Sequence, residues 1–347
     1  MDSDNEEIGD GSWFEYDGDI SFDCESWIEE TPEERIWLDV VKRDGFKLAL
    51  IDNQTERICS EAIEQNAYAL TYVKNQTRDI CLIAVRGVHA WDVLKYVRDQ
   101  IEEICLEAVR AHPSSLQYVR EQTEKICLEA VRMEADVLRY VRKQTEEICL
   151  AAVRQNGWEL QYVKNQTEKV CLKAVACRGS SLQYVKEQTE EICLTAVRQD
   201  SEALAYVENQ TVEMCLEAVS KNAETLALVR HQTEEICLEA VIQDGRSLQY
   251  VRDQTDEICL QAIRDNSESL KYVLDQTEEI CLAAVRSSGW ALQYVRNQTM
   301  EICLEAMKRG SDPELIRDED LREQVKQCAK GIRFLKTKVA KKTMMLD

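Results

Sequence analysis

Cysteine is the residue type in this 347-residue chain whose spacing most strongly suggests chemistry. Regularly spaced thiols could form disulfides, bind a metal ion or sense redox state. Which of these is possible depends on the elements that carry the cysteines. Twelve of the fifteen recur every 22 residues, with one step of 24: Cys59, Cys81, Cys105, Cys127, Cys149, Cys171, Cys193, Cys215, Cys237, Cys259, Cys281 and Cys303, here called the cysteine ladder.

The spacing argues against disulfides and metal sites. Packed helices lie roughly 8 to 10 Å apart, whereas the Cα atoms of a disulfide lie roughly 4.4 to 6.8 Å apart. The chain has no Cys-x-x-Cys pair, and its three histidines fall in different repeats: His89, His112 and His231. We therefore interpret the ladder as small apolar residues between helices and expect no metal or other cofactor. The off-ladder cysteines are the expected exposed thiols: Cys24, Cys177 and Cys328.

The sequence around each cysteine predicts a pair of antiparallel helices. Residues 144–165 read QTEEICLAAVRQNGWELQYVKN, with apolar residues at a helical spacing. Thr145 stands where an N-cap belongs, and acidic residues follow it where the helix dipole favours them. Asn156 is a second start signal, and a short helix would then run through Leu160, Tyr162 and Val163. The two helices should span roughly nine and eight residues.

A period of 22 residues is also typical of leucine-rich repeats, in which Leu160 to Val163 would form a strand. Such a strand needs an apolar residue two positions after the valine. That position holds polar residues such as Asn165, Glu187 and Asp253. The pattern favours an all-helical repeat, with the strand-plus-helix coil as the remaining alternative.

We therefore expect an all-α fold, an α-solenoid of about thirteen two-helix repeats over residues 33–310. A single repeat buries too little apolar surface to fold alone, so stability must come from contacts between repeats. Trp37 occupies the cysteine position of a divergent first repeat. We expect residues 1–32 to form an acidic, partly disordered head. Residues 311–347 hold a capping helix, Leu315–Lys330, and a basic tail.

Two further ladders accompany the cysteines. Twelve glutamines from Gln54 to Gln298 each precede the cap position, and we expect them to bond the backbone of the next repeat. Ten tyrosines from Tyr72 to Tyr294 form a tyrosine ladder, in which leucine substitutes at Leu50 and Leu228. That substitution indicates that ring packing matters more than the hydroxyl, although an aromatic groove for a peptide remains open.

Charge is unevenly distributed along a chain whose net charge is −22. Residues 1–34 contain fourteen Asp or Glu and no Lys or Arg, whereas residues 321–347 contain eight Lys or Arg and two acids. An acidic body repels phosphates, so nucleic acid is expected to bind only through the basic tail, if at all. The chain shows neither a secretory signal pattern nor a long apolar run, so we expect an intracellular protein that is not embedded in a membrane.

Nothing in the sequence predicts an enzyme. The glutamate pairs that could be read as acid and base, such as Glu146-Glu147, recur at one helix start and complement its dipole. Phosphate-binding loops, nucleotide fingerprints and Ser/His/Asp arrangements are not found. We expect a scaffold for protein–protein interaction whose partner surface lies at the start of the second helix. The residues predicted to form it are Trp91, Asp136, Trp158, Ser181, Arg246 and Trp290.

One stretch breaks the repeat. Two extra residues enter near Gly87 to Ala90, and Ile101 replaces the threonine cap of the following helix. The insertion could bend the solenoid or open a pocket beside His89 and Trp91, and a tolerated loop insertion is the default interpretation.

Residues 146–167, EEICLAAVRQNGWELQYVKNQT, resemble the repeats of the domain of unknown function 4116 family. That family occurs in large DNA viruses of amoebae and in some protists and bacteria. The resemblance extends over residues 33–310 and implies the host cytoplasm, a virus factory or the virion as location, but no catalytic residues. It leaves open a second function, a virion or virus-factory assembly protein that associates as a homo-oligomer through its oppositely charged ends.

Overall fold

The computed structural model describes residues 31–88 and 90–329, and in these residues the secondary structure is helical, without strands. Thirteen α-helices, α1 to α13, are each followed by a shorter 3₁₀ helix, and residues 319–329 form a further helix. The α-helices are α1 (Pro32–Arg43), α2 (Glu56–Gln65), α3 (Arg78–Arg86), α4 (Glu102–Ala111), α5 (Glu124–Met133), α6 (Glu146–Gln155), α7 (Glu168–Cys177), α8 (Glu190–Gln199), α9 (Val212–Lys221), α10 (Glu234–Gln243), α11 (Asp256–Asp265), α12 (Glu278–Ser287) and α13 (Met300–Lys308).

The 3₁₀ helices span six residues in most repeats. They are η1 (Gly45–Leu50), η2 (Ala67–Tyr72), η3 (Val93–Tyr96), η4 (Pro113–Tyr118), η5 (Ala135–Tyr140), η6 (Gly157–Tyr162), η7 (Gly179–Tyr184), η8 (Ser201–Tyr206), η9 (Ala223–Leu228), η10 (Gly245–Tyr250), η11 (Ser267–Tyr272), η12 (Gly289–Tyr294) and η13 (Pro313–Leu315). The predicted all-α solenoid of about thirteen repeats is confirmed, and the strand at Leu160 to Val163 is wrong.

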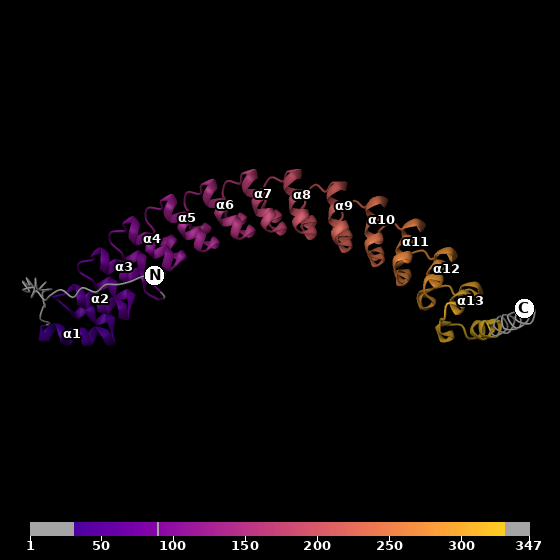
Figure 1. The fold of residues 1–347 in the computed structure, drawn as a ribbon, viewed down its shortest axis with the longest axis horizontal. Helices are drawn as coiled ribbons and strands as arrows, with labels where there is room; N and C mark the ends of the chain where they lie inside the picture. The colour runs from indigo at the N-terminus through magenta and orange to yellow at the C-terminus, as the bar shows by residue number, and fades with distance from the viewer. Residues whose placement is uncertain (1–30, 89, 330–347) are drawn as a thin grey trace, which may run out of the picture.

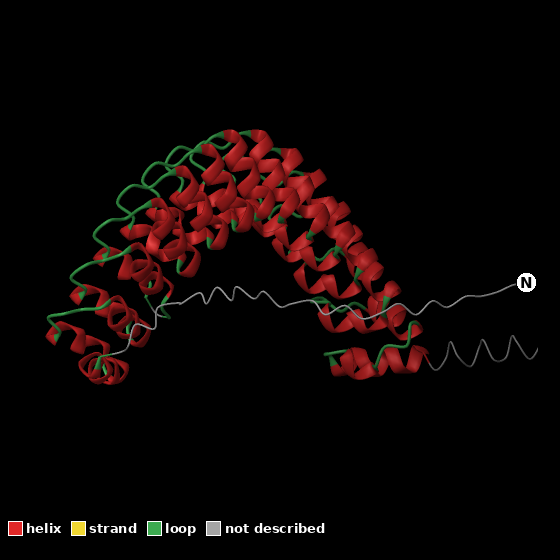
Figure 2. Cartoon of the chain, turned by 60° about the vertical axis from the view of Figure 1, so that its left-hand side comes forward, coloured by secondary structure: helices red, strands yellow, loops and turns green. Residues whose placement is uncertain are grey.

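The repeats follow one another along an arch, with α1 and α13 at its opposite ends (Figure 1). The view from another side shows the same helices packed in register, with loops joining successive repeats (Figure 2). Each α-helix contacts the α-helix of the next repeat, and from η1 to η12 each 3₁₀ helix contacts the next 3₁₀ helix. Each residue position of the repeat therefore forms a row that runs along the whole arch.

The second helix of each repeat is a 3₁₀ helix, where the sequence analysis expected a longer helix without specifying its type. In η6 the amide of Glu159 donates to the carbonyl of Asn156 at 3.0 Å, three residues back. The buried residues Gly157, Leu160 and Val163 are three apart, and residues three apart lie directly above one another in a helix with three residues per turn. The apolar spacing therefore fits the tighter helix.

Threonine caps start the α-helices as predicted. The Thr145 hydroxyl accepts the amide N–H of Ile148 at 3.4 Å, and in the next repeat Thr167 donates to Glu146 at 3.1 Å. A cap thus satisfies an amide of its own helix and also contacts the first turn of the preceding one. At α4, Ile101 occupies the cap position and makes no such hydrogen bond.

The core is a continuous layer between the α-helices and the 3₁₀ helices. In the repeat that contains α6, Ile148, Ala152, Val153 and Leu160 are completely buried. A Cβ on Gly157 would lie 2.4 Å from the carbonyl oxygen of Ala174 in the next repeat, so only glycine permits this approach. Core burial therefore depends on the neighbouring repeat, as the composition of the unit predicts.

The carboxyl end of the described chain departs from the repeat at the predicted place. After α13 the chain turns through Gly310 and forms only the three-residue η13. Residues 319–329 are helical, so the predicted capping helix begins four residues after Leu315. Gln298 donates to the carbonyl of Leu315 at 3.0 Å, at the position where most earlier repeats have tyrosine. The acidic head up to residue 30 and the basic tail from residue 330 lie outside the described residues.

Candidate interaction surface

The cysteine ladder is buried, and its cysteines are free thiols. Burial raises the pKa of these thiols, to about 11 at Cys105 and Cys127. The Cys149 thiol donates to Oε1 of Gln144 at 4.0 Å, a weak contact inside the repeat. Cys177 and Cys328 are exposed as predicted, and Cys24 lies outside the described residues. The ladder therefore packs the core and offers no accessible thiolate.

No three or more His, Cys, Asp or Glu side chains converge as metal ligands would within residues 31–88 and 90–329. His112 is used structurally, since its Nε2 lies 2.8 Å from the carbonyl oxygen of Gly87. His89 lies outside the described residues.

The glutamine ladder joins each repeat to the next, as predicted. Nε2 of Gln144 donates to the carbonyls of Leu138 at 3.4 Å and Tyr162 at 2.9 Å. Its Oε1 accepts the amide N–H of Lys164 at 2.9 Å. The same pattern recurs from Gln54 to Gln298. These side chains satisfy backbone groups of the loops that no helix would otherwise pair.

A row of lysines and arginines, two residues before the ladder glutamines, was not predicted to have a role. The Arg120 guanidinium donates to the carbonyls of Arg98 at 2.8 Å and Val97 at 3.2 Å, in the preceding repeat. Lys164 and Arg252 make the same bonds one repeat back. The signal was the recurrent Lys or Arg after the repeat's last valine. These cations therefore also join repeats through the backbone.

The second residue of each six-residue 3₁₀ helix differs in size and charge from repeat to repeat, and most of these side chains are exposed. We call this set the variable row: Phe46, Tyr68, Ser114, Asp136, Trp158, Ser180, Glu202, Glu224, Arg246, Glu268 and Trp290. Four of the predicted surface residues, Asp136, Trp158, Arg246 and Trp290, belong to it. No packing role common to all repeats therefore fixes the residue type at these positions.

Two predicted surface residues are misplaced by one position. Ser181 was predicted to line the partner surface, but this prediction is wrong because its side chain is completely buried. It occupies the inward position after the variable row, and Ser180 holds the outward one. Trp91 precedes the corresponding residue, Asp92, and is nevertheless partly exposed. Its indole lies 5.8 Å from the Tyr118 ring, centroid to centroid.

Trp158 is held in place by the next repeat. Its Nε1 donates to Oγ of Ser180 at 3.1 Å, and the Arg178 guanidinium lies 4.3 Å from the indole centroid. The ring is nevertheless 40% exposed. An indole fixed in one orientation loses little conformational entropy on binding, which suits it as a contact residue.

The tyrosine ladder runs beside the variable row, and together the two rows form what we call the interaction face. Tyr72 and Tyr206 are exposed, and most other ladder rings are half-buried against the core. Lys271, the residue before Tyr272, lies over two rings of the ladder, 4.9 Å from the Tyr272 centroid and 5.8 Å from the Tyr294 centroid. The face therefore presents aromatic rings with cations between some of them.

The irregular repeat is tied to both of its neighbours. Asp92 accepts a hydrogen bond from Tyr68 at 2.6 Å and pairs with Lys95. This contact raises the pKa of the Tyr68 hydroxyl to about 12, because the hydroxyl donates to a carboxylate. Ser115 donates from Oγ to the carbonyl of Trp91 at 2.7 Å. The described residues around the insertion are thus integrated into the solenoid.

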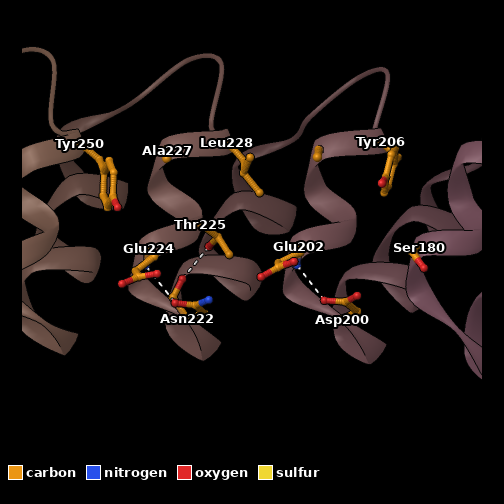
Figure 3. A pocket seen from close by; sticks show the side chains of 11 residues that line it. Ser180, Asp200, Glu202, Tyr206, Asn222, Glu224, Thr225, Ala227, Leu228 and Tyr250 are labelled. Carbon is orange, nitrogen blue, oxygen red and sulfur yellow. Dashed lines mark hydrogen bonds between the residues drawn. The ribbon is translucent and has the colours of Figure 1, made fainter.

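A cavity of about 330 Å³ opens on the interaction face between η8 and η10. Figure 3 shows Glu202 and Glu224 on one side of it and the ring positions Tyr206, Leu228 and Tyr250 on the other. The sequence analysis noted Leu228 as a gap in the tyrosine ladder but did not combine it with the neighbouring alanines, Ala205 and Ala227. These small residues were the signal that could have located the cavity.

No family model matches the chain, and no curated protein is similar to it. In the described part of the chain no helix is both long enough and apolar enough to cross a membrane.

Proposed function

We propose that the chain is a non-enzymatic scaffold that binds protein partners along the interaction face. The observation that supports this proposal is the difference in sequence variation between the rows of the solenoid. The positions that build the core and the loops repeat, whereas the variable row changes between aromatic, acidic, basic and hydroxyl side chains. Solenoids of this type commonly bind partners along one extended face, and variation confined to exposed positions is what such recognition needs.

The character of the face supports a protein partner. Trp158 and Trp290 are 40% and 58% exposed, and indoles are enriched where proteins make their strongest contacts. The acidic residues of the same row, such as Glu202, Glu224 and Glu268, would repel a nucleic acid backbone. A polypeptide with apolar and basic side chains fits this combination best.

The proposal includes the origin that the repeat unit suggests. The resemblance of residues 146–167 to the domain of unknown function 4116 repeats supports, as part of this proposal, a scaffold that acts in the cytoplasm or a virus factory of an infected amoeba. Partners are therefore best sought in amoebal lysate.

The test compares capture of partners by three forms of the full chain. Trp158→Ala/Trp290→Ala removes two exposed anchors from the variable row. Glu147→Ala/Lys173→Ala changes two exposed residues of α6 and α7 outside it and serves as the control. Proteins retained from amoebal lysate are identified by mass spectrometry, and circular dichroism checks that all three forms fold equally.

We expect specific partners to be lost from the tryptophan variant and kept by the control. Equal retention by all three folded forms at 500 mM salt would overturn the proposed face. Partners that disappear from the wild-type chain at that salt concentration would indicate charge association rather than a specific scaffold.

A further inference from the structure

The cavity between η8 and η10 arises where successive repeats depart from the common pattern in the same direction. Leu228 replaces a ladder tyrosine, and alanine precedes the ring position in both repeats, at Ala205 and Ala227. Most other repeats have Gln, Lys or Arg in the alanine position. In the same region Glu208 replaces the Lys or Arg that follows the repeat valine. Each change therefore removes bulk or positive charge.

Two carboxylates at the cavity, those of Glu202 and Glu224, have no partner among the described residues. Glu202 and Glu224 lie on its wall, with Asp200 beside them (Figure 3). Asp200 accepts the backbone N–H of Glu202 at 3.0 Å as a helix cap. Within the described ranges neither glutamate carboxylate makes an ion pair or a hydrogen bond, whereas Asp136 of the same row pairs with Arg139 at 2.9 Å. The cavity thus carries negative charge that the protein does not neutralise locally.

Two other repeats show which side chain occupies the equivalent space beside the ladder rings. Lys95 lies over two consecutive ladder rings, 4.7 Å from the Tyr96 centroid and 5.9 Å from the Tyr118 centroid. Lys271 lies in the same way over the rings of the eleventh and twelfth repeats. Ala227 is the residue equivalent to both lysines, so the cavity lacks the ammonium that Lys95 and Lys271 place over the ladder rings of their repeats. The distances are those of cation–π contacts.

From this geometry we infer that the cavity binds the side chain of a lysine or arginine from an extended segment of a partner protein. The charged end would lie against the Tyr250 ring, facing Glu202 and Glu224 across the cavity, with the stem of the side chain over Leu228. A cavity of about 330 Å³ accommodates such a side chain. The inference rests on the proposed function, since it names the partner chemistry of one part of the interaction face.

The test uses the full chain and a fluorescein-labelled peptide, Gly-Ser-Arg-Ser-Arg-Ser-Gly, with a citrulline peptide of the same length as the neutral analogue. Ala227→Lys places the missing ammonium in the cavity. Gln161→Lys adds the same charge at the equivalent position of another repeat and is the matched control. Affinities are measured by fluorescence anisotropy at 150 mM salt, after circular dichroism has shown that both variants fold.

We expect Ala227→Lys to weaken binding of the arginine peptide at least tenfold, and Gln161→Lys to change it less than twofold. Glu202→Gln/Glu224→Gln should also weaken it about tenfold, whereas Asp136→Asn/Glu268→Gln should not. The citrulline peptide should bind at least tenfold more weakly than the arginine peptide. Equal effects of the two lysine variants would overturn the inference that the peptide binds at the cavity, because the overall negative charge of the protein would then hold the peptide. No measurable binding of the arginine peptide at millimolar protein would overturn it as well.

The lysate capture separates failure of this inference from failure of the scaffold. If captured partners require Trp158 and Trp290 but Ala227→Lys does not change the affinity for the arginine peptide, the proposed binding at the cavity is wrong. The proposed scaffold function is then still supported. If the cavity variants weaken binding of the arginine peptide but no captured partner depends on the two tryptophans, binding at the cavity is supported. Partner binding along the rest of the interaction face is then contradicted.

Discussion

Gln144 donates from Nε2 to the carbonyl oxygen of Tyr162 at 2.9 Å, across the boundary between two repeats. Its Oε1 accepts the amide of Lys164 at 2.9 Å, and Nε2 also bonds the carbonyl of Leu138. One side chain therefore satisfies three backbone groups in two repeats. The loops between repeats have no regular hydrogen bonding of their own, so this glutamine takes the role that a helix partner has elsewhere.

Gln144→Leu should destabilise the solenoid, since it keeps the size of the side chain but leaves these backbone groups unpaired. We expect a loss of about 2 to 4 kcal/mol in the free energy of unfolding, measured by urea denaturation. Gln161→Ala, which removes an exposed glutamine of the same repeat, is the control and should cost less than about 0.5 kcal/mol. A Gln144→Leu variant as stable as this control would contradict the role of the ladder.

The cysteine ladder should resist alkylation. Burial raises the pKa of Cys127 and Cys193 to about 11, so at pH 8 these thiols are protonated as well as inaccessible. We expect iodoacetamide at pH 8 to modify Cys177 and Cys328 at least about 100-fold faster than ladder cysteines, as followed by peptide mass spectrometry. In urea all of them should react at similar rates. Rapid labelling of a ladder cysteine in the folded protein would show that the arch opens locally.

The sequence predicted the fold well because stacking imposes the same requirement on each repeat. Thr145 and Cys149 recur at the fixed period, and both have the predicted roles of cap and core. The type of the second helix was harder to predict, because the three-residue spacing of Gly157, Leu160 and Val163 fits one face of a 3₁₀ helix and also of an α-helix.

The interaction face was harder to predict because, of two adjacent residues on a 3₁₀ helix, one can be exposed and the other buried. Ser180 faces outward and Ser181 faces inward, and only alignment with Trp158, 22 residues before Ser180, distinguishes them. The cavity depends on what adjacent repeats lack at Ala205, Ala227 and Leu228. Whether these small residues leave a cavity depends on the distance between consecutive ring positions, and this distance cannot be derived from the sequence.

Ile101→Thr should stabilise the irregular region. Ile101 has the same extended backbone as the threonine caps, with φ −67° and ψ 154°, but it accepts no hydrogen bond from the first turn of α4. A threonine hydroxyl there would pair with the amide of Ile104, as Thr123 pairs with that of Ile126 at 3.3 Å. We expect a gain of about 1 kcal/mol in the free energy of unfolding.

The reverse change, Thr123→Ile, is the matched control and should cost a similar amount. Thermal unfolding followed by circular dichroism would check both variants. If neither threonine nor any other N-cap residue at position 101 stabilises the protein, the insertion before this position prevents the cap geometry.

Glu159 makes the stability of the sixth repeat depend on pH. It is 4% exposed and occupies the inward position where other repeats have small residues such as Ala203. Its Oε1 accepts a hydrogen bond from Nδ2 of Asn156 at 2.9 Å, but its buried Oε2 has no partner. Burial raises the pKa of the Glu159 carboxyl, and the nearby Asp136 carboxylate raises it further. The folded state therefore favours the protonated form.

The direction of the pH effect follows from that raised pKa. The contribution of Glu159 to stability is fully present below the pKa of the unfolded chain and is lost as pH rises through the higher pKa of the folded state. Glu159→Gln keeps an acceptor for Asn156 and cannot ionise, so it should be more stable than the wild type at pH 8, by about 1 kcal/mol or more. The difference should shrink towards pH 4. Urea denaturation at intervals between these values would measure it, with the exposed Glu121→Gln as control, and a difference that stays constant with pH would show that the buried carboxylate is not the cause.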